Sequence, residues 1–339
     1  MNEPRIQWNT RESTVGVAAL ALLTLGLALV PVIGSDSLQV TLVELLYLLS
    51  LAQIWNLLAG YGGMVSVGQQ GFVGVAAYAL FVLAEKNGVD PFAGLLIAGL
   101  ITAAFSIPVA LFAFRLRGGY FAIGTWVIAE VLRLGSLRIE ALGAGNIQSF
   151  TVRNAFANYS LEYRRDLIYW TALALAVGAT LIVVAVLRSR TGLALRAVRD
   201  NLEGAEALGV SATRARLTVW VIAAFWTGLT GGLIHLNTAT VTNRDAFSVL
   251  SWTAVVIFIV IIGGVGSTTG PIVGIAVFWF ISDQFQDNDT WRFIVLGSVA
   301  AVMAVGNAGG IDGLIQRWRP FQLLPVNVRL QRQDKQPDS

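Results

Sequence analysis

The sequence predicts an all-α fold, that of a polytopic membrane protein with about ten membrane-spanning helices. Three observations support this fold class. Hydrophobic residues make up 55% of the 339 residues and charged residues only 13%, which is about half of the charged share of an ordinary soluble domain. Apolar runs of spanning length follow one another along most of the chain, and glycine is abundant at 35 residues. Little sequence is then left for a soluble domain of useful size.

Each predicted span is an apolar run of about twenty residues, the length that a helix needs to cross the hydrocarbon core. The first run lacks the small-residue ending of a cleavable signal peptide, so we expect it to be a retained helix. The eighth and ninth runs are either complete spans or broken, re-entrant segments. The ten runs cover residues 14–34, 38–60, 64–84, 91–114, 120–137, 167–187, 217–236, 250–266, 270–285 and 291–305.

The distribution of lysine and arginine predicts the topology. With the N-terminus inside, roughly twice as many Lys and Arg residues lie inside as outside, in agreement with the positive-inside rule. This topology makes residues 1–13 a cytoplasmic N-terminal tail, residues 14–308 the transmembrane domain and residues 309–339 a cytoplasmic C-terminal tail. It also explains the excess of basic residues, so we expect the lipid bilayer and no nucleic acid as a partner.

Two polar segments outside the spans have less regular patterns. From Arg317 onward the C-terminal tail holds three prolines among many Gln and Arg, which favours an irregular or disordered chain. The longest outside segment covers about residues 138–166 and mixes charges with Gly and Asn. It is either a solvated loop or a docking surface for an external protein.

The longest polar interruption of the apolar chain is the segment 188–216, which lies inside in this topology and holds six arginines. Within it, apolar residues recur every three or four positions, at Leu195, Val198, Leu202, Ala205 and Leu208. This spacing predicts one amphipathic helix, and Gly209 after it is a helix stop signal. The segment is either a solvated linker at the membrane surface or a surface presented to another protein.

Two glycine-rich stretches, residues 59–71 and 263–271, interrupt apolar helix. Glycine permits sharp turns and close approach of backbones. Backbone freed from helix inside a membrane has to be satisfied by protein or by water in a cavity. Paired interruptions in two parts of a chain therefore point to a transport path. The alternative is that these glycines only allow close helix packing or form short loops at the bilayer surface.

Few charged or titratable residues fall inside the predicted spans. Glu130 and Arg133 are three residues apart, so we expect them to face one way and to pair. Glu44 and Asp283 lie toward span ends, where they can snorkel. His235 is the only histidine and cysteine is absent; we expect His235 to be a polar helix-end residue and not a proton relay or ligand. No residue pattern predicts a cofactor or a metal site.

Four ordered motifs resemble a known family. The run at 203–209, EGAEALG, resembles the E-A-A-x-x-x-G loop of ATP-binding-cassette importer permeases. The longer runs RAVRDN at 196–201 and AEALGV at 205–210 resemble the LivM type of branched-chain amino acid permease. So do WNLLAGYGG at 55–63 with SVG at 66–68, RGGYFAIGT at 117–125 with EVLRL at 130–134, and GGVGS at 263–267 with GP at 270–271. Together these motifs cover about two thirds of the chain.

The chain departs from the family pattern at several places. Gly204 replaces the first Ala of the loop motif, and the apolar-Leu-Pro ending is absent. Residues 144–148 read AGNIQ where the family has a Thr-Gly-Gly-rich segment. Gln69 and Gln70 stand where His or Gln followed by Ala is frequent, and residues 307–314 replace a Pro-x-Gly-Leu ending. These departures bear on the substrate more than on the class of transporter.

The resemblance implies the permease subunit of an ATP-driven importer in the inner membrane of a prokaryote. Such a subunit works with a second permease subunit, two cytoplasmic ATPase subunits and an external substrate-binding protein. Relatives carry branched-chain amino acids, and others carry urea, amides or small aromatic acids. The chain itself lacks the Gly-Lys-[Ser/Thr] of a phosphate-binding loop, because its only lysines are Lys86 and Lys335 and neither follows glycine. We therefore expect no enzymatic activity in this subunit.

In such permeases the segment 188–216 is a coupling loop that docks on the ATPase. The docking residues carried over here are Glu203, Ala205 and Gly209, with Arg199 and Asp200 beside them. The residues expected along the substrate path come from the glycine-rich stretches and the motif at 117–125: Gly62, Gly63, Ser66, Gly68, Gly71, Phe121, Thr125, Gly264, Gly266 and Ser267.

Two other function classes are weighed against this one. A stand-alone secondary transporter or channel for a small polar solute predicts coupling acids or a histidine deep in the spans, and the chain offers little beyond Glu130. An intramembrane enzyme requires a catalytic constellation, and the sequence holds no His cluster, Cys or metal-ligand pattern.

Overall fold

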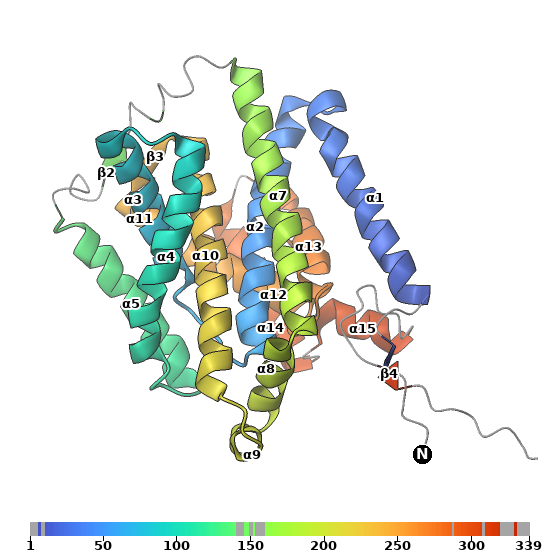
Figure 1. The fold of residues 1–339 in the computed structure, drawn as a ribbon. Coiled ribbons are helices and arrows are strands. Elements are labelled where there is room, and N and C mark those ends of the chain that lie inside the picture. The colour runs from blue at the N-terminus through green and yellow to red at the C-terminus, as the bar shows by residue number, and fades with distance from the viewer. Residues whose placement is uncertain are drawn as a thin grey trace, which may run out of the picture.

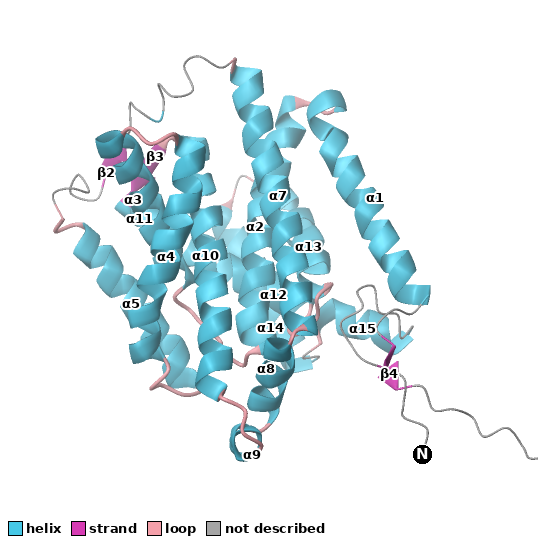
Figure 2. Ribbon diagram, viewed as in Figure 1, coloured by secondary structure: helices cyan, strands magenta, loops and turns pink. Residues whose placement is uncertain are grey.

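The computed structural model describes residues 6–7, 11–139, 146–148, 152, 160–286, 288–306, 309–318 and 329–330. These residues are almost entirely helical, which confirms the predicted all-α class (Figure 1; Figure 2). The exceptions are two antiparallel pairs of very short strands. β1 (Ile6–Gln7) pairs with β4 (Arg329–Leu330), and β2 (Asn146–Gln148) pairs with β3 (Thr240–Thr242).

Most of the helices run side by side as one bundle, with short helices at its two ends (Figure 1). α8 and α9 mark one end of the bundle, and β2 and β3 lie toward the other. In chain order the helices are α1 (Arg11–Ile33), α2 (Asp36–Asn56), the π-helix η1 (Leu57–Tyr61), α3 (Gln69–Asn87), α4 (Pro91–Ala113), α5 (Gly119–Ser136), α7 (Leu161–Arg188), α8 (Arg190–Asp200), α9 (Leu202–Ala207), α10 (Ala212–Thr238), α11 (Asn243–Ala246), the π-helix η3 (Leu250–Ala254), α12 (Val255–Gly263), α13 (Gly270–Gln284), α14 (Asp289–Gly306) and α15 (Gly310–Trp318).

All ten predicted runs fall on helices, but not all of those helices are long and apolar enough to cross a membrane. Among the described residues seven segments are: Thr14–Ile33, Asp36–Tyr61, Pro91–Ala113, Leu161–Arg188, Ala212–Thr238, Asn243–Gly263 and Asp289–Gly306. α13 is shorter, with 15 residues. α3 and α5 are less hydrophobic, because they contain polar residues such as Gln69, Gln70 and Glu130. The predicted count of about ten is thus higher than length and composition support.

Local sequence fixes several helix ends. Ser35 caps α2 and Ser160 caps α7, each accepting a hydrogen bond from a backbone N–H of the first turn. Asp90 caps α4 in the same way, and Pro91 occupies its first turn, where a missing N–H costs nothing. α3 ends at Gly88 in the left-handed conformation. Signals of this kind depend on neighbours in sequence, and these ends of α2, α3 and α4 agree with the predicted ones within three residues. α7 begins six residues before the predicted span, because its first turns are polar and were not part of the apolar run.

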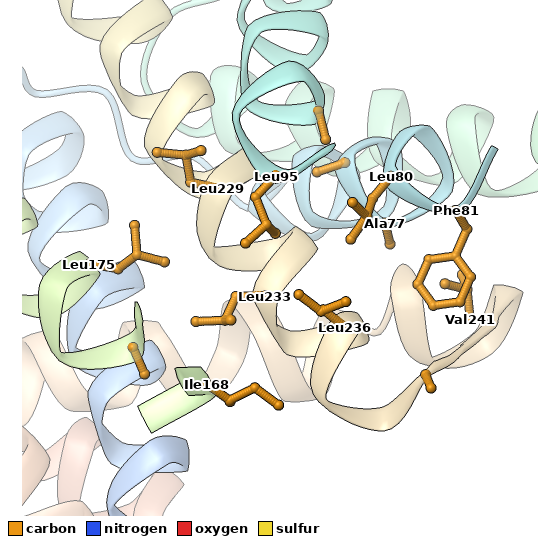
Figure 3. Packing of buried hydrophobic residues seen from close by; sticks show 14 of the residues in the cluster. Ala77, Leu80, Phe81, Leu95, Ile168, Leu175, Leu229, Leu233, Leu236 and Val241 are labelled. Atoms are coloured by element: carbon orange, nitrogen blue, oxygen red, sulfur yellow. The ribbon is translucent and has the colours of Figure 1, made fainter. Parts of the chain in front are cut away.

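α10 is the central helix of the bundle, packed against α2, α3, α4 and α7. Toward one end its Leu229, Leu233 and Leu236 meet Leu80 of α3 and Leu95 of α4 (Figure 3). Toward the α8–α9 end, Trp220 is almost completely buried. The rings of Phe72, Phe114 and Phe121 surround Trp220 edge to face, with centroids 5.5, 5.7 and 6.0 Å away.

The two predicted terminal tails contain more helix than expected. α1 begins at Arg11, within predicted tail 1–13. Its first turns lean away from the bundle (Figure 1), while Leu27 and Val30 near its end pack against the core and Tyr169 of α7 donates to Leu27 O. α15 covers residues 310–318 of predicted tail 309–339, and it packs on α12 and α13. The remainder of both tails lies outside the described residues, apart from the β1–β4 pair. So does most of the predicted outer segment 138–166, of which β2 joins β3.

Candidate functional site: the junction of two glycine-rich breaks

The first glycine-rich break runs from Gly60, in the last turn of η1, through an extended segment, residues 62–68, to the start of α3. The prediction that the third span begins at Met64 is wrong, because α3 begins only at Gln69. Gln69 Nε2 donates to Thr227 Oγ1 at 3.2 Å, and Thr227 lies near the middle of α10. The extended backbone therefore runs from the end of α2 into the depth of the bundle. Non-helical backbone at this depth is stable only where other protein groups or water form hydrogen bonds with its N–H and C=O groups.

Side chains from two helices hold this extended segment. Thr125 Oγ1 of α5 accepts from Val67 N at 3.0 Å, and Trp55 Nε1 of α2 donates to Ser66 O at 2.8 Å. Met64, Ser66 and Gly68 are buried, whereas Gly63 and Val65 are exposed. This alternation is that of an extended chain with one open face, so the first break presents a surface while its other face is anchored.

The second break, residues 264–269, is a tight turn between α12 and α13. Gly264 and Gly266 have φ values of 136° and 75°, a region that residues with a Cβ rarely adopt. A Cβ on Gly263 would stand 2.8 Å from Gly274 N, and one on Gly310 would stand 2.6 Å from Gly264 Cα. Glycine is required here because three backbone segments pack directly on one another. The predicted eighth and ninth spans are accordingly separate helices joined by this turn.

The two breaks meet at one point. Asn56 Nδ2 donates to Ser267 O at 2.7 Å, and Asn56 Oδ1 accepts from Gly266 N at 2.8 Å. A Cβ on Gly60 would stand 2.7 Å from Gly266 Cα, so the backbones touch. We call this contact, formed by Asn56, Gly60, Gly266 and Ser267, the glycine junction. Gln53 Nε2 extends it by donating to Thr268 O at 3.1 Å.

The residues predicted to line the substrate path fall into two groups in the structure. Around the glycine junction lie Gly62, Gly63, Gly264, Gly266 and Ser267. Along the contact of the first break with α5 lie Ser66, Gly68, Gly71, Phe121 and Thr125. In the second group, Gly68, Gly71 and Thr125 line one small cavity with Trp220. That cavity has room for about one water molecule, which is too small for a solute such as an amino acid.

A buried carboxylate supports the second break from α15. Asp312 is only 5% exposed. It accepts from Thr269 Oγ1 at 2.9 Å, from Gln316 Nε2 at 2.7 Å and from Ser267 Oγ. The sequence does not single out Asp312, because it lies in the predicted C-terminal tail, where one isolated acidic residue forms no recognisable motif.

The charged segment 188–216 forms two helices, so the prediction of one amphipathic helix is wrong. Asn201 separates α8 from α9 with extended backbone (φ −154°, ψ 101°), and its Oδ1 accepts from Gly204 N at 2.9 Å. Leu195, Val198 and Ala205 are buried as the spacing predicts. Leu208, however, is 86% exposed, because the chain turns through Gly209 in the left-handed conformation.

The surface around α9 is acidic and partly apolar, whereas Arg188, Arg190, Arg199 and Arg214 are exposed on either side of it. Asp200, Glu203, Glu206, Leu208 and Gly209 are exposed at one end of the bundle, and we call these five residues the α8–α9 tip. The predicted docking residue Ala205 is not part of it. Ala205 is 3% exposed and packs against Val198 and Ala212, so it supports the shape of the tip from inside.

Arg199 is partly exposed, with 40% of its side chain accessible, and its guanidinium lies between Asp200 of the α8–α9 tip and the end of η1. Its Nη1 donates to Gly60 O at 2.7 Å, and its Nε donates to Asp200 Oδ1 at 3.0 Å. One turn earlier, the Arg196 guanidinium lies 5.8 Å from the centre of the Tyr61 ring. The prediction for Arg199 was a place on the docking surface. The local sequence could not reveal its contact with Gly60, which is 139 residues away in the chain.

Several other polar residues of the spans have partners, whereas Gln53 Oε1 and Gln69 Oε1 are buried without one. Glu130 and Arg133 form the predicted ion pair, with Arg133 Nε 2.9 Å from Glu130 Oε2. Arg133 Nη1 also donates to Asn243 Oδ1 at 2.9 Å. His235 is buried, and its Nδ1 lies 3.0 Å from Gly231 O of its own helix. Among the described residues, no group of three or more His, Cys, Asp or Glu is placed to hold a metal ion.

Comparison with known proteins gives one family. The family model described as the permease component of branched-chain amino acid transport systems matches residues 38–305. That range holds η1, both breaks, α8 and α9.

Three relatives illustrate the similarity. The high-affinity branched-chain amino acid transport system permease protein LivM of Salmonella typhimurium is 26% identical, and that of Escherichia coli is 27% identical. Each comparison covers 91% of this chain and 74% of the relative. The galactose/methyl galactoside import permease protein MglC of Haemophilus influenzae is 27% identical over 52% of this chain and 54% of its own length. No solved structure matches the chain significantly.

Proposed function

The chain belongs to the family of permease components of branched-chain amino acid transport systems, and from this premise we propose that it is the membrane-spanning permease subunit of an ATP-driven importer. Its role is to form part of the substrate path and to couple that path to separate ATPase subunits. The observation that carries the proposal is the α8–α9 tip. A short, charged pair of helices projects between two helices of spanning length, α7 and α10, where a partner at the membrane surface can reach it.

ATP hydrolysis has to come from other chains in this proposal. The sequence contains no glycine-rich loop that ends in Gly-Lys-[Ser/Thr], which is the element that cradles phosphates in such ATPases. Two cytoplasmic ATPase subunits, a second permease subunit and an external substrate-binding protein complete the importer. The excess of Lys and Arg on the α8–α9 side supports a cytoplasmic position for the tip, in the inner membrane of a prokaryote.

Glu203, Gly209 and Asp200 form the docking surface in this proposal. All three are exposed on the α8–α9 tip, while Ala205 keeps the two short helices together from within. A carboxylate at the start of α9 also stabilises that helix, because it lies in the first turn, near the positive end of the helix dipole. Reversal of this charge therefore acts on both docking and local shape.

The substrate class we propose is branched-chain or related amino acids. The two relatives with the longest coverage given above carry that substrate in their names. MglC, which matches only about half of this chain, is named for a sugar. We propose that the residues around the glycine junction and along its contact with α5 border the path, because non-helical backbone reaches the depth of the bundle only there among the described residues.

Copurification tests the proposal directly. The chain is coexpressed with a candidate second permease and cassette ATPases, purified in lipid, and compared with Glu203→Arg. Glu162→Arg is the matched control, since Glu162 is an exposed acid in the first turn of α7, far from α8 and α9. We expect the native chain and the control to retain the ATPase and Glu203→Arg to lose it. The reverse outcome is that no ATPase binds any of the three while the chain alone moves a solute down its gradient. That outcome replaces the importer with a stand-alone transporter.

A further inference from the structure

Arg199 connects α8 to the glycine junction by a directed hydrogen bond. Its Nη1 stands 2.7 Å from the carbonyl oxygen of Gly60. Its Cγ lies 3.2 Å from the position that a Cβ on Gly63 would occupy, and Nη1 lies 3.9 Å from the corresponding position on Gly266. The side chain thus lies across the first break and reaches the edge of the second.

The Gly60 carbonyl is a group that needs a donor from outside its own helix. It belongs to the last turn of η1, where carbonyl groups have no further N–H along the helix to accept from. Neighbouring carbonyl groups accept hydrogen bonds from nearby backbone N–H groups: Leu57 O accepts from Gly62 N, and Leu58 O accepts from Met64 N. The chain is extended after Gly62 and turns away, so Arg199 supplies the donor to Gly60 from α8.

Two arginines tie α8 to η1. Arg196 and Arg199 are one turn apart on α8, and they contact the adjacent residues Tyr61 and Gly60. α8 is itself held as a rigid piece by Leu195 and Val198, which are 0% and 2% exposed. A displacement of the α8–α9 tip therefore moves both guanidinium groups together, and with them the end of η1.

The fork of the guanidinium makes a double attachment. While Nη1 donates to Gly60 O, Nε and Nη2 each lie 3.0 Å from Asp200 Oδ1. A lysine has one ammonium group and cannot hold both acceptors in this geometry. Asp200 belongs to the exposed α8–α9 tip, so a single side chain links an outward residue to a buried backbone carbonyl.

We propose that Arg199 is a positioning residue that transmits displacement of the α8–α9 tip to the glycine junction, through its hydrogen bond to Gly60 O. The inference rests on the proposed function, because the displacement is that imposed by docked ATPase subunits. Arg199 acts on the first break and not on the ATPase, so its loss separates ATP hydrolysis from transport.

The test uses the full importer, reconstituted in liposomes with its partner permease, ATPases and substrate-binding protein, and with leucine as the transported probe. ATP hydrolysis is measured with and without leucine-loaded binding protein, and leucine uptake is measured in parallel. The variants are Arg199→Met and Arg199→Lys. Arg190→Met is the matched control, since Arg190 is an exposed arginine at the other end of α8.

We expect Arg199→Met to assemble with the ATPases and to keep basal hydrolysis, while leucine uptake per ATP falls about tenfold or more, within the usual range of coupling between sites. Arg199→Lys should be intermediate, and Arg190→Met should match the native importer. If Arg199→Met does not fold, Arg199→Lys decides the matter, and unchanged uptake per ATP in that variant overturns the inference.

Two further results distinguish the possible failures. If Arg199→Met transports as efficiently per ATP as Arg190→Met, Arg199 does not transmit the displacement, although the importer assignment stands. If Arg199→Met or Arg199→Lys folds, as judged by its elution and unfolding temperature, but no longer retains the ATPase, Arg199 is a docking residue and the inference is wrong. If the native chain retains no ATPase at all, the proposed function itself fails.

Discussion

Gly60→Ala is the sharpest test of the glycine junction, because it adds one methyl group where two backbones touch. The new Cβ would lie 2.7 Å from Gly266 Cα and closer still to Gly266 N and to Asn56 Oδ1. Backbone atoms cannot rotate away as the tip of a side chain can. The two breaks would therefore have to separate by about an ångström for an ordinary carbon contact to form.

The expected cost follows from two effects. Overpacking of a well-packed interior by one methyl group costs roughly 1–3 kcal/mol. Separation also breaks the part-buried bond from Gly266 N to Asn56 Oδ1, which is 2.8 Å long, and the loss of such a bond costs about 0.5–1.5 kcal/mol. Alanine regains up to about 1 kcal/mol because it restricts the unfolded chain and favours helix. The net destabilisation is then about 0.5–4.5 kcal/mol.

Thermal unfolding in detergent, followed by the fluorescence of the ten tryptophans, measures this effect. At roughly 2 °C per kcal/mol for a chain of this length, the midpoint should fall by about 1–9 °C. Gly135→Ala in α5 is the matched control, because a Cβ there meets nothing within 4 Å, and it should leave the midpoint unchanged or raise it slightly. If the two variants unfold at the same temperature, the breaks do not meet at Gly60 and the geometry of the junction is wrong.

Three other substitutions address separate parts of the site. Asn56→Leu removes both hydrogen bonds that join the breaks and leaves a part-buried N–H and C=O without these partners, so we expect about 1–3 kcal/mol of destabilisation in the same unfolding assay; an unchanged midpoint would contradict this. Asp312→Ala removes the acceptor shared by Ser267, Thr269 and Gln316; limited proteolysis should then cleave within 310–318 at protease concentrations that leave the native chain intact. Thr125→Val keeps the side-chain volume but removes the acceptor for Val67 N, and we expect about 1–2 kcal/mol of destabilisation together with lower uptake in the reconstituted importer.

Much of the fold was predictable because it depends on local sequence. α4 was predicted at 91–114 and ends at Ala113, since Asp90 and Pro91 mark its start and the apolar run sets its length. The third span was predicted five residues too early, at Met64. Met64, Val65 and Val67 are apolar in an extended chain as they would be in a helix, and hydropathy alone does not distinguish the two.

The site was predictable only where its contacts are local. Glu130 and Arg133 pair as neighbours on one helix face, and the exposure of Glu203 and Gly209 follows from a charged segment between apolar helices. The junction depends on Asn56 and Gly266, which are 210 residues apart, and the position of the Arg199 guanidinium depends on Gly60. The glycine-rich stretches indicated that the backbone packs closely against another part of the chain. They did not indicate which part.

The two breaks are held by different kinds of contact, and this difference suggests which of them moves. The second break is fixed by backbone packed on backbone, with Gly310 and Gly274 against Gly264 and Gly263, and by the several bonds to Asp312. The first break has fewer such contacts, which are those of Gly60 with Gly266 and of Gly68 with the Thr125 backbone. Its other contacts are single hydrogen bonds from side chains, of which the bond from Arg199 is one. Packed backbones separate only with loss of many contacts at once, whereas a side-chain hydrogen bond can move with its donor. α8 contacts the more adjustable of the two breaks, which is the arrangement required if a push at the α8–α9 tip is to change the junction without unfolding it.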